Sequence, residues 1–444
     1  MFFKNIAGKL LLFALSISIL GFFPESSRAE YDYINITNPF LKKLPVAVPR
    51  FKAMGEDPVE VEIAESGCLM LENFLEFSRY FKVLDRGSFL EEPSKAGIVG
   101  TRLNFQNWTA IGAELLITGG VYAAGDNIKV ELRLFDTFRG QMLTGKIYTG
   151  RTTDVRKIAL RFAAEVVRLL TGGAGIFDSR IAFISTATGD KEIFICDFDG
   201  YGSKRVTFDR SIVLSPAWST DGKRLAYTSY KRGKPDLFIK NMAEKRGYVV
   251  DLPGLNISPA WVPGSADSLA ATLSYSGDQE IYLLTRTGKI TKRLTNSWGI
   301  DVSPAFSPDG KQMAFVSRRS GTPQIHIMRM DTGQVRRLTY DGAYNQSPAW
   351  SPRGDKIAFV GMEKNKINIY TIDADGRNLQ QLTADSGDNE SPAWSPDGSL
   401  IAFSSTREGT SRIYVMTAFG TDQRRLLLQK GAQTTPRWSP NVKK

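Results

Sequence analysis

A repeat of 44 residues in the C-terminal half is the feature that most constrains the fold of this chain. The phrase Ile181-Ala182-Phe183 returns five times, always 44 residues after the previous copy. The later copies begin at Leu225, Leu269, Met313, Ile357 and Ile401. Two further phrases, first seen as Ile193-Phe194 and Arg205-Val206-Thr207, return in the same register, the last with some weaker copies. A fixed period of this length indicates that one supersecondary unit is repeated six times.

Each repeat predicts four short strands. The three phrases are β-branched or aromatic and are bounded by Gly, Asp, Asn or Pro, as strands are. A Ser-Pro-Ala-Trp phrase, as at residues 215–218, opens the unit, and we expect its proline near the first residue of a strand, where no ladder hydrogen bond is donated. The Pro and Gly of the next turn, as at 307–310, suit a tight hairpin. Four strands in about 40–45 residues are the period of a β-propeller blade.

The two ends of the array favour a closed ring over an open rod. No Ser-Pro-Ala-Trp strand precedes the first unit, which follows the glycine-rich linker 172–175. After the sixth unit comes an orphan copy, Thr435-Pro436-Arg437-Trp438. The orphan strand and the incomplete first unit form one complete sheet only if the ring closes, whereas a solenoid needs capping repeats. We therefore predict an all-β six-bladed propeller closed by the C-terminal strand.

Several recurring residues of the repeat have structural explanations. Five tryptophans share one position and Phe306 fills the sixth, so we expect these rings to pack between blades. These tryptophans are Trp218, Trp261, Trp350, Trp394 and Trp438. His326, the only histidine, stands where other blades have Phe or Tyr and is expected in the core. Basic pairs such as Arg336-Arg337 recur in the outermost strand, where charge discourages edge-to-edge pairing. Their spacing around the rim argues against a nucleic-acid site.

The residues before the repeat predict a separate α/β domain over 30–173, followed by the propeller over 174–444. Helices are expected from Pro58 to about Tyr80 and over 155–170, the second capped by Thr153 or Asp154 and ended by glycines 172 and 173. Strands are expected over 44–51, 81–84, 115–122, 128–136 and 143–148. A domain of roughly 130 residues is small for an active site of its own but large enough to bind a partner.

Residues 1–29 are typical of a signal peptide. Lys4 and Lys9 form a positive region, the apolar run 10–23 follows, and Ser27-Arg28-Ala29 offers the small residues that a signal peptidase reads. The run is shorter than the ~20 residues that span a bilayer. We expect cleavage after Ala29 and an exported mature chain that does not insert into the membrane.

Motifs for catalysis or metal binding are incomplete. Two cysteines, Cys68 and Cys196, cannot form a disulfide scaffold or a CxxC site, and one histidine excludes sites with two imidazoles. Residues 140–146 have the glycine and lysine spacing of a phosphate-binding loop without its Ser/Thr. The Asp-x-Asp-Gly phrases at 197–200 and 373–376 lack the remaining ligands of a calcium loop and predict turns. A propeller-gated serine peptidase would need a Gly-x-Ser-x-Gly motif and a histidine base. No cofactor and no metal are expected.

An export signal, a small α/β domain and six blades of the type Ser-Pro-Ala-Trp-Ser-Pro-Asp-Gly-x-x-Ile-Ala-Phe together resemble the TolB family of the Gram-negative Tol-Pal system. The resemblance extends over nearly all of the mature chain, including Asp199-Gly200-Tyr201 and the terminal Pro436-Arg437-Trp438-Ser439-Pro440. It implies a periplasmic, non-enzymatic linker that binds the peptidoglycan-associated lipoprotein Pal at one mouth of the propeller and TolA through its mature N-terminus. It further implies roles in outer-membrane integrity and cell division, and it allows other outer-membrane lipoproteins as partners.

The resemblance places the Pal site at residues just before the proline of each blade's first strand. Here those residues are Asn256, Asp301, Val302, Ser303, Asn345, Gln346, Asn389 and Glu390. Polar residues in loops at one end of a rigid ring, free of strand pairing, suit a binding surface, although ordinary turns have the same composition. The TolA-contacting residues would be Glu30, Tyr31, Asp32, Tyr33, Ile34 and Asn35. This segment can dock on the sheet or add a strand to a partner.

Two other classes of function remain open at this point. A propeller that binds sugars or peptides would have a concave mouth lined by aromatic residues. An enzyme would need a pair of carboxylates that converge in the channel.

Overall fold

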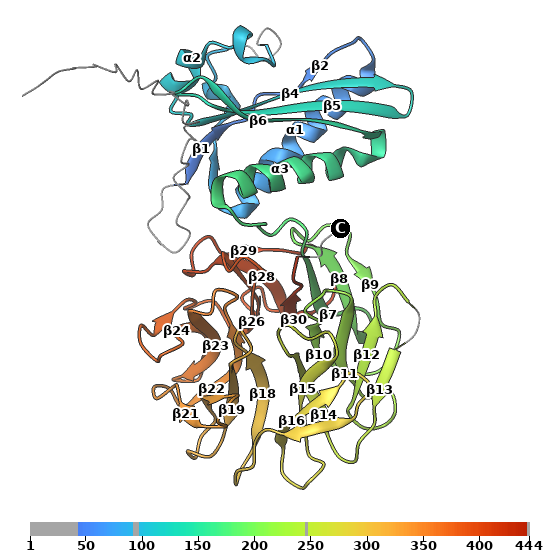
Figure 1. Cartoon of the computed structure of the whole chain (residues 1–444), viewed down its shortest axis with the longest axis vertical. Helices are drawn as coiled ribbons and strands as arrows, with labels where there is room; N and C mark the ends of the chain where they lie inside the picture. The colour runs from blue at the N-terminus through green and yellow to red at the C-terminus, as the bar shows by residue number, and fades with distance from the viewer. Residues whose placement is uncertain (1–42, 92–96, 245–246, 442–444) are drawn as a thin grey trace, which may run out of the picture.

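The computed structural model describes residues 43–91, 97–244 and 247–441, in which an N-terminal α/β unit rests on one end of a β-propeller (Figure 1). The expected signal peptide and the expected TolA-contacting residues 30–35 lie outside these ranges.

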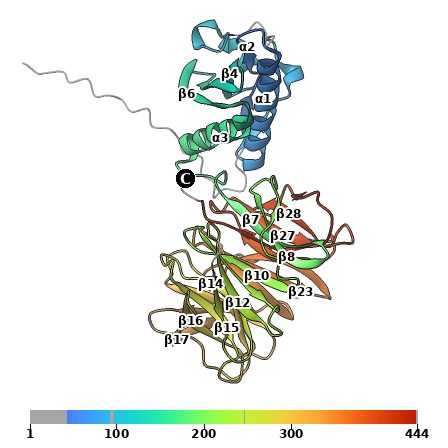
Figure 2. The ribbon, with the colours of Figure 1, turned by 90° about the vertical axis from the view of Figure 1, so that its right-hand side faces the viewer.

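Two long helices cover one face of the N-terminal sheet, side by side (Figure 2). Helix α1 (Pro58–Ser78) begins after Asp57, whose carboxylate accepts a hydrogen bond of 2.9 Å from the Val59 N–H. Helix α3 (Val155–Thr171) ends at Gly172, whose φ of 72° lies in the left-handed region. The apolar faces of both helices are buried in one core with the sheet.

The sheet has the strand order β3-β1-β4-β5-β6, and β2 pairs with β4. Its strands are β1 (Leu44–Ala47), β2 (Lys52–Ala53), β3 (Phe81–Val83), β4 (Leu115–Ala124), β5 (Asn127–Asp136) and β6 (Gln141–Arg151). The strand expected over 44–51 is shorter than predicted, because Pro49 has no N–H to continue the ladder. A short helix, α2 (Phe105–Ala110), lies in a segment for which the sequence predicted no element.

In the described part of the chain, six four-stranded antiparallel sheets form the blades of the propeller. The blade β10–β13 consists of Val213–Trp218, Arg224–Ser229, Asp236–Asn241 and Gly247–Val250. The blade β14–β17 consists of Asn256–Trp261, Ser268–Leu273, Glu280–Thr285 and Ile290–Arg293. The blade β18–β21 consists of Asp301–Phe306, Gln312–Ser317, Gln324–Arg329 and Val335–Arg337. The blade β22–β25 consists of Tyr344–Trp350, Lys356–Glu363, Lys366–Asp373 and Gln380–Gln381, and the blade β26–β29 of Asn389–Trp394, Leu400–Ser405, Arg412–Thr417 and Arg424–Arg425.

The sixth blade confirms the predicted closure of the ring. Its order is β30-β7-β8-β9, so the C-terminal strand β30 (Gln433–Trp438) is the innermost strand of the sheet that β7 (Arg180–Thr188) begins. The blade is completed by β8 (Asp190–Asp197) and β9 (Lys204–Arg205). The Trp438 Nε1–H donates a hydrogen bond of 2.6 Å to Ser179 Oγ, which fastens β30 to the residue just before β7.

The innermost strands differ from the prediction in where they begin. In β10 the register shifts between Leu214, opposite Thr228, and Ala217, opposite Ala226. Pro216 therefore lies in a β-bulge inside the strand and not at its first residue. Sheets tolerate proline at both of these places. The residue before each of these prolines has a φ of 50–56°, in the left-handed region. These residues are Ser215, Ser258, Ser303, Ser347, Ser391 and Thr435.

The repeated tryptophans are buried between blades, as the sequence predicted. Each is 6–9% exposed. The Trp261 Nε1–H donates to the carbonyl of Ala217 in the preceding blade at 3.2 Å, and Trp394 does the same to Ala349 at 3.0 Å. This position therefore contributes packing between blades, and at Trp218, Trp261 and Trp394 it adds a hydrogen bond to the preceding blade.

Candidate functional site

The propeller has two ends, and the N-terminal unit occupies only one of them (Figure 1). Tyr80 Oη donates to Asp397, in the β26–β27 turn, at 2.9 Å. Arg156 Nη2 lies 2.9 Å from an oxygen of Asp199, in the β8–β9 turn. The innermost strand of every blade ends on the side of the propeller that faces the N-terminal unit. The six innermost strands therefore begin at the opposite end of the propeller. We call that end the open mouth; its loops join the outermost strand of one blade to the innermost strand of the next.

The expected Pal-site residues lie at the open mouth, but all eight belong to strands and four of them are buried. Asn256, Asp301, Asn345 and Asn389 are 0–2% exposed and pair with the second strand of their own blade. The interpretation of the expected residues as loop residues free of strand pairing was therefore wrong, because all except Ser303 pair with the second strand of their own blade. The reason is the bulge at each proline, which lets the strand begin two residues earlier.

The side chains of these buried residues hold the ring together. Asn345 Nδ2 donates to Gln324 of the preceding blade at 2.8 Å. Asn256 makes the equivalent contact to Asp236 at 3.3 Å, and Asn389 to Asn368 at 3.2 Å. Asp301 is paired with Arg319 at 2.7 Å, within its own blade. Buried polar contacts of this kind are costly to disrupt, so their replacement would change stability as well as binding.

The other four expected residues are accessible at the open mouth. Glu390 is exposed, whereas Val302, Ser303 and Gln346 are half-buried. Desolvation at the ring and the charge of neighbouring Asp388 raise the pKa of Glu390 above its usual range. These four can meet a partner without breaking the links between blades.

The loops of the open mouth also expose large apolar side chains that the sequence analysis missed. Leu428, Trp298, Tyr340 and Phe208 are 86%, 75%, 71% and 69% exposed. A usable signal was present in the sequence: Phe208, Tyr340 and Leu428 occupy one position of the repeat, three residues after the end of the outermost strand. Isolated exposed apolar residues are ordinary, but several at one end of a ring are typical of an interface.

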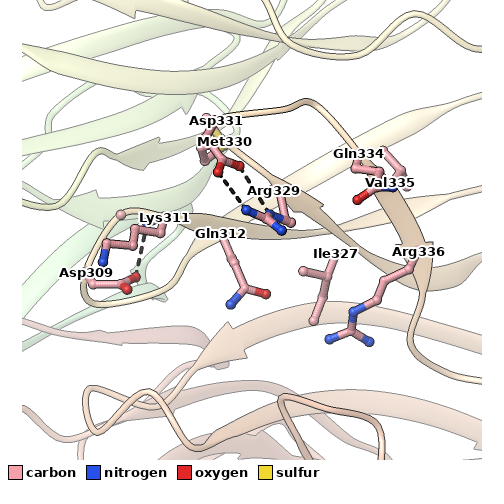
Figure 3. Close-up of a pocket in the computed structure, with 11 residues that line it drawn as sticks. Asp309, Lys311, Gln312, Ile327, Arg329, Met330, Asp331, Gln334, Val335 and Arg336 are labelled. Atoms are coloured by element: carbon pink, nitrogen blue, oxygen red, sulfur yellow. Dashed lines mark hydrogen bonds and ion pairs between the residues drawn. The ribbon is translucent and has the colours of Figure 1, made fainter.

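A surface hollow of about 1030 Å³ lies at the other end of the propeller, on the blade β18–β21 (Figure 3). Arg329 is paired with Asp331 at 2.7 Å, and the backbone N–H of Lys311 donates to Asp309 at 3.0 Å. Hydrogen bonds from the Ser307 hydroxyl and the Lys311 N–H lower the pKa of Asp309, and the hydrogen bond from Arg329 lowers that of Asp331. Both carboxylates of the hollow are therefore engaged by groups of the same blade.

The residues considered for chemistry have structural roles. The cysteines are both free and buried, and burial raises the pKa of Cys68 to about 12. His326 is 2% exposed, as predicted for a core residue. Residues 141–146 belong to β6, and the two Asp-x-Asp-Gly phrases form turns between strands. Among the residues that the structure covers, no cluster of His, Cys, Asp and Glu could hold a metal, and no helix is long and apolar enough to cross a membrane.

Two family models match the sequence. The model of the TolB amino-terminal domain matches residues 32–143, and the model of the TolB beta propeller domain matches residues 167–442.

Individual relatives agree with these matches. The chain is similar to the Tol-Pal system protein TolB of Desulfosudis oleivorans, with 56% identity over 64% of this chain and 65% of the relative. It is 44% identical to the protein TolB homolog of Chlorobaculum tepidum, over 64% of each chain. The matched part thus spans slightly less than two thirds of these relatives. The crystal structure of TolB from Acinetobacter baumannii superposes with a TM-score of 0.77 and 26% identity, covering 90% of this chain and 97% of that one. None of these names is that of an enzyme.

Proposed function

Because the chain belongs to the TolB family of the Tol-Pal system, we propose that it is a non-enzymatic periplasmic scaffold that binds Pal at the open mouth of its propeller. In this proposal residues 1–29 direct export, and residues 30–173 and 174–444 form the two domains of the chain. By holding Pal, the protein would contribute to outer-membrane integrity and to constriction of the envelope at division.

The observation that carries the proposal is the group of exposed apolar side chains at the open mouth. Trp298, Tyr340, Phe208 and Leu428 lie in the loops at the ends of the blades, and none of them lines the axial channel. Aromatic residues on an accessible rim are typical of protein interfaces, where they supply most of the binding energy. Glu390 and Gln346 lie at the same end and can supply the polar contacts.

The N-terminal residues 30–35 form the second part of the proposal. We assign them to TolA by the resemblance to the family alone, since they lie outside the described residues. A short segment with the composition of a strand can pair with a partner's strand or with a strand of this chain, and these two states would exclude each other.

Titration calorimetry of the chain from Glu30 to Lys444 against the soluble domain of Pal from the same organism tests the central claim. Trp298→Ala and Tyr340→Ala should each weaken binding by about 1–3 kcal/mol, as for interface aromatics. Both side chains are more than two thirds exposed, so the fold should tolerate their loss. Phe138→Ala is the matched control, because Phe138 is 71% exposed in the β5–β6 turn of the N-terminal unit.

Saturable one-to-one binding that Phe138→Ala leaves intact would support the scaffold. Absence of heat and of a complex in gel filtration, with both proteins folded, would contradict it. Asp301→Ala is unsuitable as the only probe, since its buried contact with Arg319 links binding to stability.

A further inference from the structure

One innermost strand carries a charge that the repeat does not predict. In five blades an alanine follows the proline of the bulge, whereas β30 has Arg437 at that place. These alanines are Ala217, Ala260, Ala305, Ala349 and Ala393. Arg437 lies opposite Ala182 in the same register in which Ala217 lies opposite Ala226, so the difference is a true replacement within the ring.

This position faces the axial channel of the propeller. The channel encloses about 560 Å³ and is lined by residues of all six innermost strands. Its walls consist of Ser, Thr, Pro, Ala and aromatic residues, and Arg437 is the one charged residue among the described residues that line it. The volume is sufficient for a small organic molecule.

Arg437 has no counter-ion within the described ranges. The only hydrogen bond of its guanidinium there is from Nη1 to the carbonyl of Pro436, at 3.1 Å, although a guanidinium has five N–H donors. Burial lowers the pKa of Arg437 to about 10, which leaves the group charged at neutral pH. A desolvated cation without a partner is costly, and an anion in the channel would offset that cost.

The channel also provides neutral donors. A hydroxyl residue precedes the proline in every blade, and none of these six hydroxyls hydrogen-bonds to any other part of the chain that the structure describes. They belong to Ser215, Ser258, Ser303, Ser347, Ser391 and Thr435. Hydroxyl groups readily donate to anionic oxygens, so the ring surrounds the charged group with donors of the right kind.

We propose that the axial channel binds a small carboxylate, held by the guanidinium of Arg437 and by hydroxyls of the ring. The planar fork of an arginine matches the two oxygens of a carboxylate. A singly charged ligand fits better than phosphate, because no second basic residue among the described lining could balance another negative charge. The channel site shares only Ser303 with the residues expected to bind Pal.

Intrinsic fluorescence offers a direct test, because the indoles of Trp218, Trp350, Trp394 and Trp438 also line the channel. The protein from Glu30 onward would be titrated with sodium acetate, and separately with sodium phosphate, at constant ionic strength set by chloride. We expect a saturable change with acetate, confirmed by calorimetry. Arg437→Ala installs the residue of the other five blades and should weaken acetate binding about ten- to a hundredfold.

Two further variants complete the test. Arg437→Lys keeps the charge and loses the fork, so it should bind with intermediate affinity. Arg377→Ala removes an exposed arginine, paired with Asp375, and should bind as the unmodified protein does. If Arg437→Ala is unfolded by circular dichroism, Arg437→Gln takes its place. The proposal would be overturned if acetate binding did not saturate, or if the Arg437 variants bound acetate as well as the unmodified protein does. Saturation by phosphate at a concentration well below that needed for acetate would also overturn it.

Discussion

His326 in β20 is a single residue whose charge state links stability to pH. Its ring lies 6.0 Å from that of Phe315, and its Nδ1 is 3.1 Å from the carbonyl of Gln324. Burial lowers the pKa of His326, with Arg319 acting in the same direction and the hydrogen bond to Gln324 opposing it. The fold therefore favours the neutral imidazole, whereas the unfolded chain takes up a proton near its ordinary pKa of about 6.5.

This difference predicts that stability falls as the medium becomes acidic. Below about pH 6.5 the unfolded state binds more protons than the folded state, so the free energy of unfolding decreases until the folded pKa is reached. His326→Phe, which installs the residue of two other blades, should remove this part of the pH dependence. Urea unfolding at about pH 7.5 and pH 5.5 measures it. An equal loss in both proteins would show that other groups cause the effect.

The basic pairs of the outermost strands show that one repeated phrase can have several roles. Lys292 and Arg336 are exposed at the sheet edge, as the sequence predicted. In contrast, Arg293 lies 3.2 Å from the buried Glu280 and donates to the carbonyl of Thr295 at 2.8 Å. Arg424 stacks 3.9 Å from the ring of Phe77 in the N-terminal unit. Such contacts depend on which element lies opposite, and a single sequence does not contain that information.

At the scale of elements, the strands could be predicted because a four-strand unit repeats in one register. The closure of the ring could also be predicted, since the orphan strand at the C-terminal end of the repeats matched the strand missing from the first repeat. The bulges in the innermost strands could not be predicted, because a proline is compatible with both a strand start and a bulge. This error of two residues turned buried strand residues such as Asn345 into apparent loop residues. The apolar side chains of the open mouth were missed because they lie outside the strand phrases.

The closing strand β30 should be essential for a cooperative fold. A chain that ends at Lys430 would lose the pairing of β30 with β7 and the buried Trp438, and would expose a strand edge. We expect such a chain to lose its cooperative thermal transition or to aggregate in gel filtration. A chain that ends at Asn441 keeps β30 and is the matched control. Trp438→Phe, which loses one hydrogen bond, should cost only about 1 kcal/mol. If the two shortened chains unfolded at the same temperature with equal cooperativity, the proposed role of β30 in closing the ring would be contradicted.

At the scale of the whole molecule, a small set of contacts joins the two units. Phe198 of the β8–β9 turn is fully buried, with its ring 5.2 Å from Phe77 and 5.4 Å from Phe177. Beside it, the guanidinium of Arg156 pairs with Asp199 and lies 3.9 Å from the ring of Tyr201. An apolar contact bordered by a partly buried ion pair fixes orientation as well as position. A force applied to the N-terminal unit would therefore be transmitted to the propeller.

Arg156 and Asp199 should stabilise this arrangement together. Their side chains are 19% and 17% exposed, so the pair is better shielded from water than a surface salt bridge. A double-mutant cycle with Arg156→Ala and Asp199→Ala should give a coupling energy of about 1 kcal/mol or more in thermal unfolding. Calorimetry of Arg156→Ala should show the transitions of the two units separating, and small-angle scattering should show a wider range of shapes. Arg329→Ala, which breaks a pair whose side chains are 58% and 62% exposed, should change neither measurement. Additive effects of the two interface substitutions, with unchanged scattering, would mean that the apolar contact around Phe198 holds the units together without the ion pair.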